Sequence, residues 1–187
     1  MPDLRAKPES NPLDSGGAWW LKVGRCGPEW RTRPYSNMAS TNNLASEIFT
    51  GEFRHSLDGK KRVTIPSSWR RNETDDYFII PNPSESCLTV MPPEVYKRIG
   101  EEAKSTCSPK DYRLFARQFY SNSQQVSTDK QGRLLLPEAY CTQAGLVGDI
   151  FLTGVFDRFE IWNVENWTQF QQRNNGLYEE VARAAGL

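Results

Sequence analysis

The sequence contains little of what an enzyme or a metal site needs. Its only histidine is His55, which lies in an alternating stretch and reads as a strand residue, and no second histidine exists to build a zinc site or an H-E-x-x-H motif. Neither a Walker phosphate loop nor a G-x-G-x-x-G fingerprint occurs, and no pair of carboxylates stands out. The sequence therefore favours a protein that is not an enzyme, with no metal site and no cofactor.

Cysteines are few and widely separated. The four are Cys26, Cys87, Cys107 and Cys141, and no two of them form a C-x-x-C pair. A disulfide framework belongs to secreted proteins, and the polar N-terminus is not followed by the apolar stretch of a signal peptide. No apolar run approaches the roughly 18 residues of a membrane span. We therefore expect free thiols in a reducing cytosol and no membrane partner.

An excess of charge of either sign is also absent. The chain of 187 residues carries 23 Lys and Arg against 23 Asp and Glu, so the formal net charge is zero. This balance predicts no partner, but it excludes none, because a basic loop can be hidden in a neutral total.

The first 47 residues lack periodicity. They mix Pro, Gly, Ser and Asn without a repeating apolar pattern, so they cannot bury enough surface to offset their ordering entropy. We expect a disordered N-terminal extension over residues 1–47. We also expect that a chain starting at Ala39 melts close to the full chain.

What the sequence does contain is an internal repeat. It reads "DGKKRVTIP" from Asp58 and "DKQGRLLLP" from Asp129, 71 residues later. With that offset and no gap, residues of like type fall into register over roughly forty positions, which indicates two copies of one supersecondary unit. The matches include Val63 with Leu134, Ile65 with Leu136, Trp69 with Tyr140, Ile80 with Phe151, Leu88 with Phe159 and Val90 with Ile161.

Each copy predicts the same order of elements. Alternating apolar residues on both sides of the charged turn predict a β-hairpin, and the proline after it predicts the start of a short helix. Two further strands and a closing helix complete each copy, at 77–80, 87–91 and 92–104 and at 150–155, 159–162 and 164–173. Between the copies, Ser108, Pro109 and Asp111 form a capping box that begins a linking helix.

The repeated turn carries the candidate chemistry. An aspartate that begins a turn accepts hydrogen bonds from backbone N–H groups, so Asp58 and Asp129 are predicted to structure the turns, and Gly132 can take a left-handed conformation. A rigid basic loop suits phosphate contact, and arginine can also bind guanine through two donors. The predicted DNA-binding residues are therefore Lys60, Lys61, Arg62, Lys130 and Arg133. The alternative is that each arginine only braces its aspartate.

Two other features have structural interpretations. The aromatic residues Trp69, Trp162 and Trp167 could stack on bases, but their repeat positions predict core residues. The stretch "RRNETDD", which starts at Arg70, is interpreted as a solvated helix end and turn.

These motifs resemble one known family. "FTGEFRHSLDGKKRVTIPSSWR" and "STDKQGRLLLPEAYCTQAGLVGDIFLTGVFDRFEIW" are similar to the two halves of the MraZ family of bacterial transcriptional regulators, over about Phe49 to Trp167. The family's Asp-x-x-x-Arg signature falls on Asp58 with Arg62 and on Asp129 with Arg133. Three features depart from the family: Lys61 stands where glycine is usual, "YCTQAGL" lacks a common charged residue, and residues 1–47 have no counterpart.

The resemblance implies more than the spacing does. It implies an α+β, β-rich fold of two tandem AbrB-like swapped-hairpin modules that form an internal pseudo-dimer, with connecting and C-terminal helices. It implies cytoplasmic, nucleoid-associated binding of double-stranded DNA at repeated short promoter boxes of the division and cell-wall gene cluster. It also implies a ring-like homo-oligomer.

The expected organisation follows from the repeat and the resemblance together. We expect a first module at 48–107, a linking helix at 108–118, a second module with its closing helix at 119–173 and a C-terminal tail at 174–187. Two alternative functions stay open: a homo-oligomeric scaffold with the same fold that has lost DNA binding, and an AbrB-like antitoxin.

Overall fold

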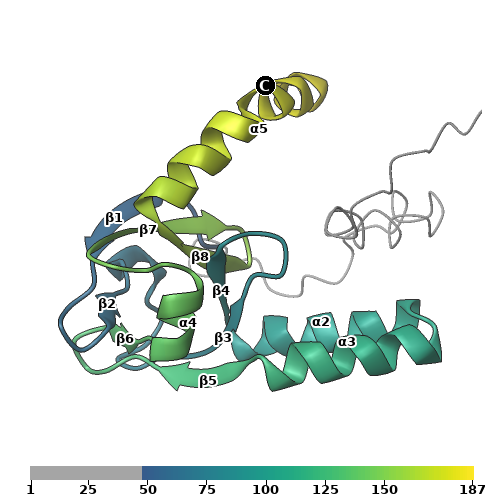
Figure 1. Ribbon diagram of the computed structural model, residues 1–187, viewed down its shortest axis with the longest axis horizontal. Coiled ribbons are helices and arrows are strands. Elements are labelled where there is room, and N and C mark those ends of the chain that lie inside the picture. Colours follow the sequence, from purple (N-terminus) through teal and green to yellow (C-terminus); the bar gives the residue numbers. More distant parts are fainter. Residues whose placement is uncertain (1–47) are drawn as a thin grey trace, which may run out of the picture. The chain divides into compact units, whose positions relative to one another are not determined.

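The computed structural model describes residues 48–187, so the expectations for residues 1–47 fall outside the described part. Within it the chain is α+β, as predicted (Figure 1). Six antiparallel strands form the main sheet, and two more form a separate short ladder of β2 (Arg62–Thr64) and β6 (Arg133–Leu135). The order across the main sheet is β1 (Glu52–Ser56), β7 (Asp149–Val155), β8 (Arg158–Asn163), β4 (Cys87–Met91), β3 (Asp76–Pro81) and β5 (Gln124–Ser127).

The two copies exchange their first strands. β1 of the first copy pairs with β7 of the second, and β5 of the second pairs with β3 of the first. The prediction that β1 and β2 form a hairpin is therefore wrong, because these two strands do not pair in the ladders of the described residues. Period-two alternation determines which side chains face the core, but it does not determine which strand lies alongside. The exchange is the swapped arrangement that the resemblance implied.

A pseudo-two-fold axis relates the copies. Val63 lies opposite Leu134, the residue 71 positions later, at the centre of the short ladder. In the main sheet Leu88 lies opposite Ile161 and Val90 lies opposite Phe159. Between these two pairs Thr89 lies opposite Glu160, which is again 71 positions later, so the axis passes between β4 and β8 at this pair.

The ungapped register fails in one place. The burial patterns of β3 and β7 coincide when Asp76 is matched to Asp149, an offset of 73 residues. The predicted match of Ile80 to Phe151 is therefore wrong, since Ile80 is buried in the position that corresponds to Thr153. The second copy has two extra residues before β7. Its connection between β7 and β8 is shorter than the one between β3 and β4, so the offset returns to 71 at β8.

The main core lies between the large sheet and the short ladder. It includes residues of both copies, so the modules share one core although the sequence repeat divides them. The rings of Phe49, Trp69, Tyr77 and Phe159 meet at centroid distances of 5.2–6.4 Å. Trp69 is thus a core residue, as its repeat position predicted.

The 3-10 helix η3 (Ser67–Trp69) and α4 (Glu138–Gln143) follow the two prolines of the repeat. They occupy corresponding places in the two copies, next to the short ladder. Cys141 of α4 is buried in the same core as Trp69.

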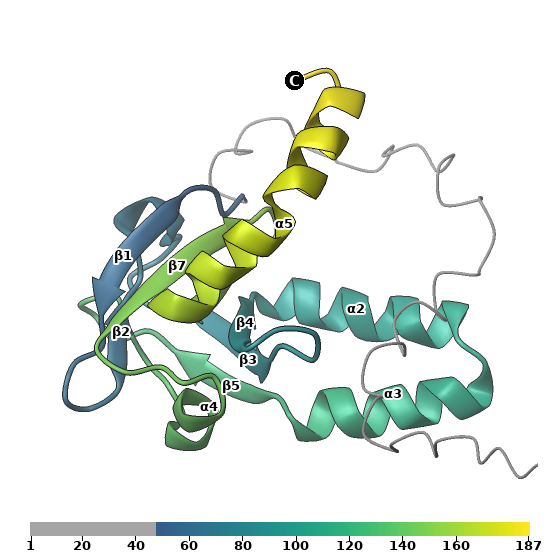
Figure 2. The same ribbon diagram turned by 45° about the horizontal axis from the view of Figure 1, so that its top comes forward.

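α2 (Pro93–Thr106) and α3 (Pro109–Ser121) lie side by side and project from the sheet at β3 (Figure 2). They pack on the other face of the sheet only at their near ends, where Tyr96 stacks between Phe78 and Phe119. The predicted capping box begins α3, since Asp111 N donates to Ser108 Oγ at 3.2 Å and Ser108 Oγ donates to Asp111 Oδ2 at 2.7 Å.

α5 (Val164–Ala184) covers the sheet near β7 and β8. Trp162 packs against Trp167 and Phe170, with ring centroids 5.3 and 5.1 Å away. The helix continues through most of residues 174–187, the expected tail. No helix within residues 48–187 is both long and apolar enough to cross a membrane.

Candidate nucleic-acid interface

The first turn is closed by its aspartate. Asp58 Oδ1 accepts hydrogen bonds from the backbone amides of Lys60 at 2.8 Å and Arg62 at 2.9 Å. Asp58 Oδ2 accepts from Arg62 Nε at 2.7 Å, and Arg62 Nη2 lies 2.6 Å from the same oxygen. The backbone adds Lys61 N to Asp58 O at 2.9 Å and Asp58 N to Arg62 O at 3.0 Å. One carboxylate thus holds both the turn and the arginine head.

The second turn repeats this geometry bond for bond. Asp129 Oδ1 accepts from the amides of Gln131 at 3.0 Å and Arg133 at 2.9 Å. Asp129 Oδ2 accepts from Arg133 Nε at 2.8 Å, with Arg133 Nη2 at 2.7 Å. Gly132 N donates to Asp129 O at 2.7 Å. The repeated motif of the sequence is therefore a repeated structure.

The unusual lysine does not change the first turn. Lys61 has a φ of 59°, and Gly132 at the same place in the second turn has a φ of 73°. The two turns therefore have the same backbone geometry, because the Asp58 hydrogen bonds hold Lys61 in a left-handed conformation that residues with a side chain rarely adopt. This conformation stores strain at a position that presents a cation.

The electrostatics of each turn follow from the same contacts. The side-chain and backbone hydrogen bonds from Arg62 lower the pKa of Asp58 to about 2. The hydrogen bonds from Arg133 also lower the pKa of Asp129. Both carboxylates are therefore ionised at neutral pH and act as permanent acceptors.

The short ladder brings the two arginines to one face. Arg62 lies opposite Leu135 and two residues from Arg133 along β6, so the two arginines are diagonal neighbours with Cα atoms about 7–8 Å apart. Val63 and Leu134 between them are fully buried, which places both arginines on the opposite, outward face. The structure thus joins the two predicted sites into one surface.

Two further hydrogen bonds tie the turns together. Ile65 N donates to Gly132 O at 2.8 Å, and Leu136 N donates to Lys61 O at 2.9 Å. Each turn is therefore anchored to the strand of the other copy. The relative position of the two basic turns is fixed by backbone and does not depend on flexible side chains.

The lysines complete this surface. Lys60 is exposed and Lys61 is half-buried. Lys130 is also exposed, and its Nζ lies 3.9 Å from Glu73 Oε1, a pair in which both side chains are largely in solvent. Such a pair contributes little stability, so Lys130 can leave it for a phosphate at small cost.

Arg70 was missed by the sequence analysis. The structure places its side chain over Gly132 of the second turn, where an added Cβ would lie 2.4 Å from Arg70 Nη1. Arg70 and Gly132 are 62 residues apart in the sequence, and they meet only because the two copies pair with each other. Local sequence carries no signal of that contact.

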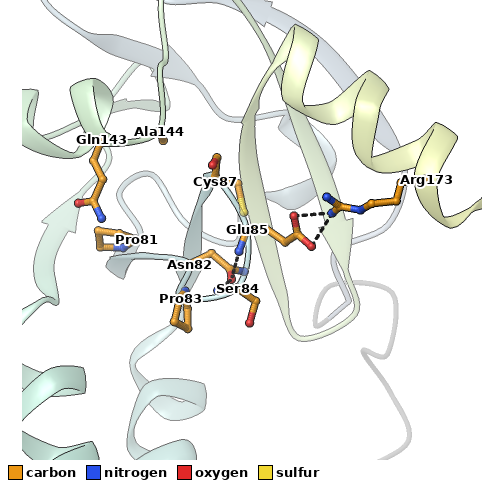
Figure 3. A pocket seen from close by; sticks show the side chains of 10 residues that line it. Pro81, Asn82, Pro83, Ser84, Glu85, Cys87, Gln143, Ala144 and Arg173 are labelled. Atoms are coloured by element: carbon orange, nitrogen blue, oxygen red, sulfur yellow. Dashed lines mark hydrogen bonds and ion pairs between the residues drawn. The ribbon is translucent and has the colours of Figure 1, made fainter. Parts of the chain in front are cut away.

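A pocket of about 430 Å³ lies elsewhere, at the loop between β3 and β4 (Figure 3). Glu85 in this loop accepts two hydrogen bonds from Arg173 Nη2, each of 2.8 Å. Burial raises the pKa of the nearby Cys87 thiol, which keeps that sulfur protonated. Among residues 48–187 no group of three or more His, Cys, Asp and Glu side chains could hold a metal ion.

Comparison with known proteins agrees with the geometry. Residues 48–118 and 119–187 each match the family model described as "MraZ protein, putative antitoxin-like". The chain is 37% identical over 136 residues to "Transcriptional regulator MraZ" of Clostridium tetani and equally to that of Natranaerobius thermophilus, covering 72% of this chain and 94% of each relative. It is 36% identical over 141 residues to that of Acetivibrio thermocellus, covering 75% of this chain and 98% of the relative. The tandem Asp–Arg turns on exchanged strands and these matches lead to one conclusion, that the chain belongs to the MraZ family.

Proposed function

We propose that the chain is a DNA-binding transcriptional regulator and that its two Asp–Arg turns contact the DNA. The names of the relatives support a role in transcription regulation. The observation that carries the proposal is the outward face of the β2–β6 ladder, where two copies of one braced basic turn are joined by backbone hydrogen bonds. A fixed basic surface of this kind suits a charged, regular ligand.

The braced arginines have donors left for DNA. In each pair, Nε and Nη2 bind the carboxylate, and Nη1 of Arg62 and of Arg133 makes no hydrogen bond to the residues described. An arginine fixed by its neighbour is pre-organised, so less entropy is lost when it binds a base edge. Bracing and DNA contact are therefore compatible roles. Lysines are better suited to phosphates, which they bind as point charges.

The distance between the two turns indicates the length of the DNA site that one chain reads. A separation of about 7–8 Å between the arginines corresponds to roughly two base pairs at 3.4 Å each. Half-sites of dimeric regulators usually lie about 34 Å apart. One chain would therefore read a single short box, and repeated boxes would be read by several chains.

The finer assignments follow the family resemblance. We propose repeated promoter boxes of the division and cell-wall gene cluster as the target, a ring-like homo-oligomer as the assembly and association with the nucleoid. We also propose that the chain consists of two modules, at 48–107 and 119–173, that arose by duplication and share one core.

Titration of labelled promoter DNA tests the function. Arg62→Ala and Arg133→Ala are each expected to weaken binding by about 1–3 kcal/mol and to relax specificity at one position. Each variant should lose no more than about 1 kcal/mol of stability in thermal melts, because the aspartate of its turn keeps its hydrogen bonds to backbone amides. Arg113→Ala is the matched control, since this exposed arginine belongs to α3, a helix that lies away from β2 and β6 (Figures 1 and 2).

Two results would contradict the proposal. If both turn variants bind DNA like the parent while the parent does bind, the turns are not the reading elements. If both lose as much stability as Asp58→Ala, the arginines are braces alone. A parent chain that forms the oligomer but binds no promoter DNA would favour the scaffold. The family description "antitoxin-like" favours the antitoxin as the second candidate in that case.

A further inference from the structure

Arg70 lies where a side chain at position 132 would begin. A Cβ added to Gly132 would be 2.4 Å from Arg70 Nη1, 2.6 Å from Cδ and 2.9 Å from Cζ. Gly132 is buried as a result, although it belongs to a surface turn. The Arg70 side chain therefore forms part of the second turn while its backbone follows η3 of the first copy.

The first turn has the reverse arrangement. The residue that corresponds to Gly132 is Lys61, and it carries a long cationic side chain of its own. The residue that corresponds to Arg70 is Cys141, which is short and buried. Each turn thus has one long cation at this place, supplied by the turn itself in the first copy and by a neighbouring segment in the second. With this exchange the two turns carry three cations each, namely Lys60, Lys61 and Arg62 in the first and Arg70, Lys130 and Arg133 in the second.

Arg70 also lacks the counter-charge that the other two cations of the second turn have. Arg62 and Arg133 are paired with aspartates, and Lys130 lies near Glu73. Arg70 makes no ion pair with any residue from 48 to 187, and its Nε is buried without a hydrogen-bond acceptor. Buried unsatisfied donors are rare in folded proteins, and each needs a reason. A purely structural role for a half-buried arginine does not supply one, because an uncompensated charge destabilises its surroundings.

We propose that Arg70 binds a DNA phosphate at the second turn, in the place that Lys61 occupies at the first. This inference rests on the proposed function, and it adds a contact that the repeated motif does not contain. The residue is half-buried, with Cδ, Cζ and Nη1 over Gly132 and Nε enclosed. Of its three nitrogens only Nε is buried without a partner, so the terminal nitrogens can donate to a ligand at the surface. A phosphate would supply both the missing counter-charge and hydrogen-bond acceptors.

Arg70→Ala tests the contact directly. A lost phosphate contact weakens binding to all sequences alike, so both promoter and unrelated DNA should bind about tenfold more weakly. The slope of log K against log salt should fall by about one unit. Arg70→Lys should keep the slope because it keeps the charge. Arg113→Ala serves as the control for loss of one exposed positive charge.

A transplant of the first-turn arrangement gives a second test. Gly132→Lys alone should lower the melting temperature, because its Cβ would collide with Arg70. The double variant Arg70→Ala/Gly132→Lys removes that collision and copies the pairing of Lys61 with a short neighbour. We expect it to recover the salt slope and most of the affinity that Arg70→Ala loses.

The outcomes separate this inference from the proposed function. If the parent binds promoter DNA and Arg70→Ala binds with the same affinity and salt slope, the contact is refuted and the function stands. If Arg70→Ala lowers only the melting temperature, Arg70 is a packing residue and the inference is again refuted. If the parent binds no DNA at any salt concentration, the function fails and this contact fails with it.

Discussion

Lys61→Gly is expected to make the protein more stable and a weaker DNA binder at the same time. Lys61 has a φ of 59°, a left-handed conformation that costs an L-residue about 1–2 kcal/mol. Glycine adopts it freely, as Gly132 does in the second turn at 73°. The greater conformational entropy of glycine in the unfolded chain offsets about 0.5–1 kcal/mol of this stabilisation. The net expectation is a gain of about 0.5–1 kcal/mol.

The gain should be visible in thermal melts. For a chain of this size, 1 kcal/mol moves the melting temperature by about 2–4 °C, so a rise of about 1–4 °C is expected. The same variant removes a cation from the proposed interface, so promoter affinity and the salt slope should both fall, the slope by about one unit. Lys60→Ala is the matched control: it removes the adjacent charge from a residue without left-handed geometry.

The comparison with Lys60→Ala decides between the effects. Both variants should weaken DNA binding, and only Lys61→Gly should raise the melting temperature. A melting temperature for Lys61→Gly at or below that of the parent would refute the reasoning. It would mean that packing of the Lys61 side chain outweighs the strain of its backbone.

Three further predictions concern the fold. The paired arginines lower the pKa of Asp58 to about 2 and that of Asp129 in the same direction, so the stability these carboxylates contribute is complete above about pH 4 and is lost as the pH falls towards 2. Urea unfolding of Asp58→Asn/Asp129→Asn should therefore show a shallower acid decline than that of the parent. Gly154→Ala should destabilise the protein by about 1–3 kcal/mol, since its Cβ would lie 2.5 Å from the backbone of Phe49, and faster hydrogen exchange at Phe49 would confirm the site. Ser108→Ala should remove about 1 kcal/mol from α3, and unchanged amide exchange in its first turn would contradict this.

Much of the fold could be predicted because its signals are local. The proline that follows each basic strand, the capping box at Ser108 and the alternation in each strand all depend on neighbours within a few residues. The partner of β1 could not be found in this way, because its pairing with β7 depends on residues of the other copy. The offset of 73 between β3 and β7 was missed for a related reason. Phe151 and Thr153 both tolerate a strand, so only burial distinguishes the correct register.

The candidate site divides in the same way. The hydrogen bonds from Asp58 to its turn lie within four residues, so the chemistry of the turn followed from the motif. The contact of Arg70 with Gly132 connects residues of different copies, and no local pattern predicts it. The conformation of Lys61 was also not predictable from its identity, because the hydrogen bonds around it override its own preference.

The exchange of strands has a consequence for synthesis on the ribosome. Asp149, at the start of β7, lies 93 positions after Ser56, at the end of β1. At about 5–20 residues per second, β1 therefore waits roughly 5–20 s before its partner is made. For most of that time, until Gln124–Ser127 is made, β3 also lacks β5, and the nascent polypeptide presents strand edges that can pair with other chains. Productive folding of this protein therefore waits for the synthesis of β7, and until then its unpaired strand edges are open to pairing with other chains.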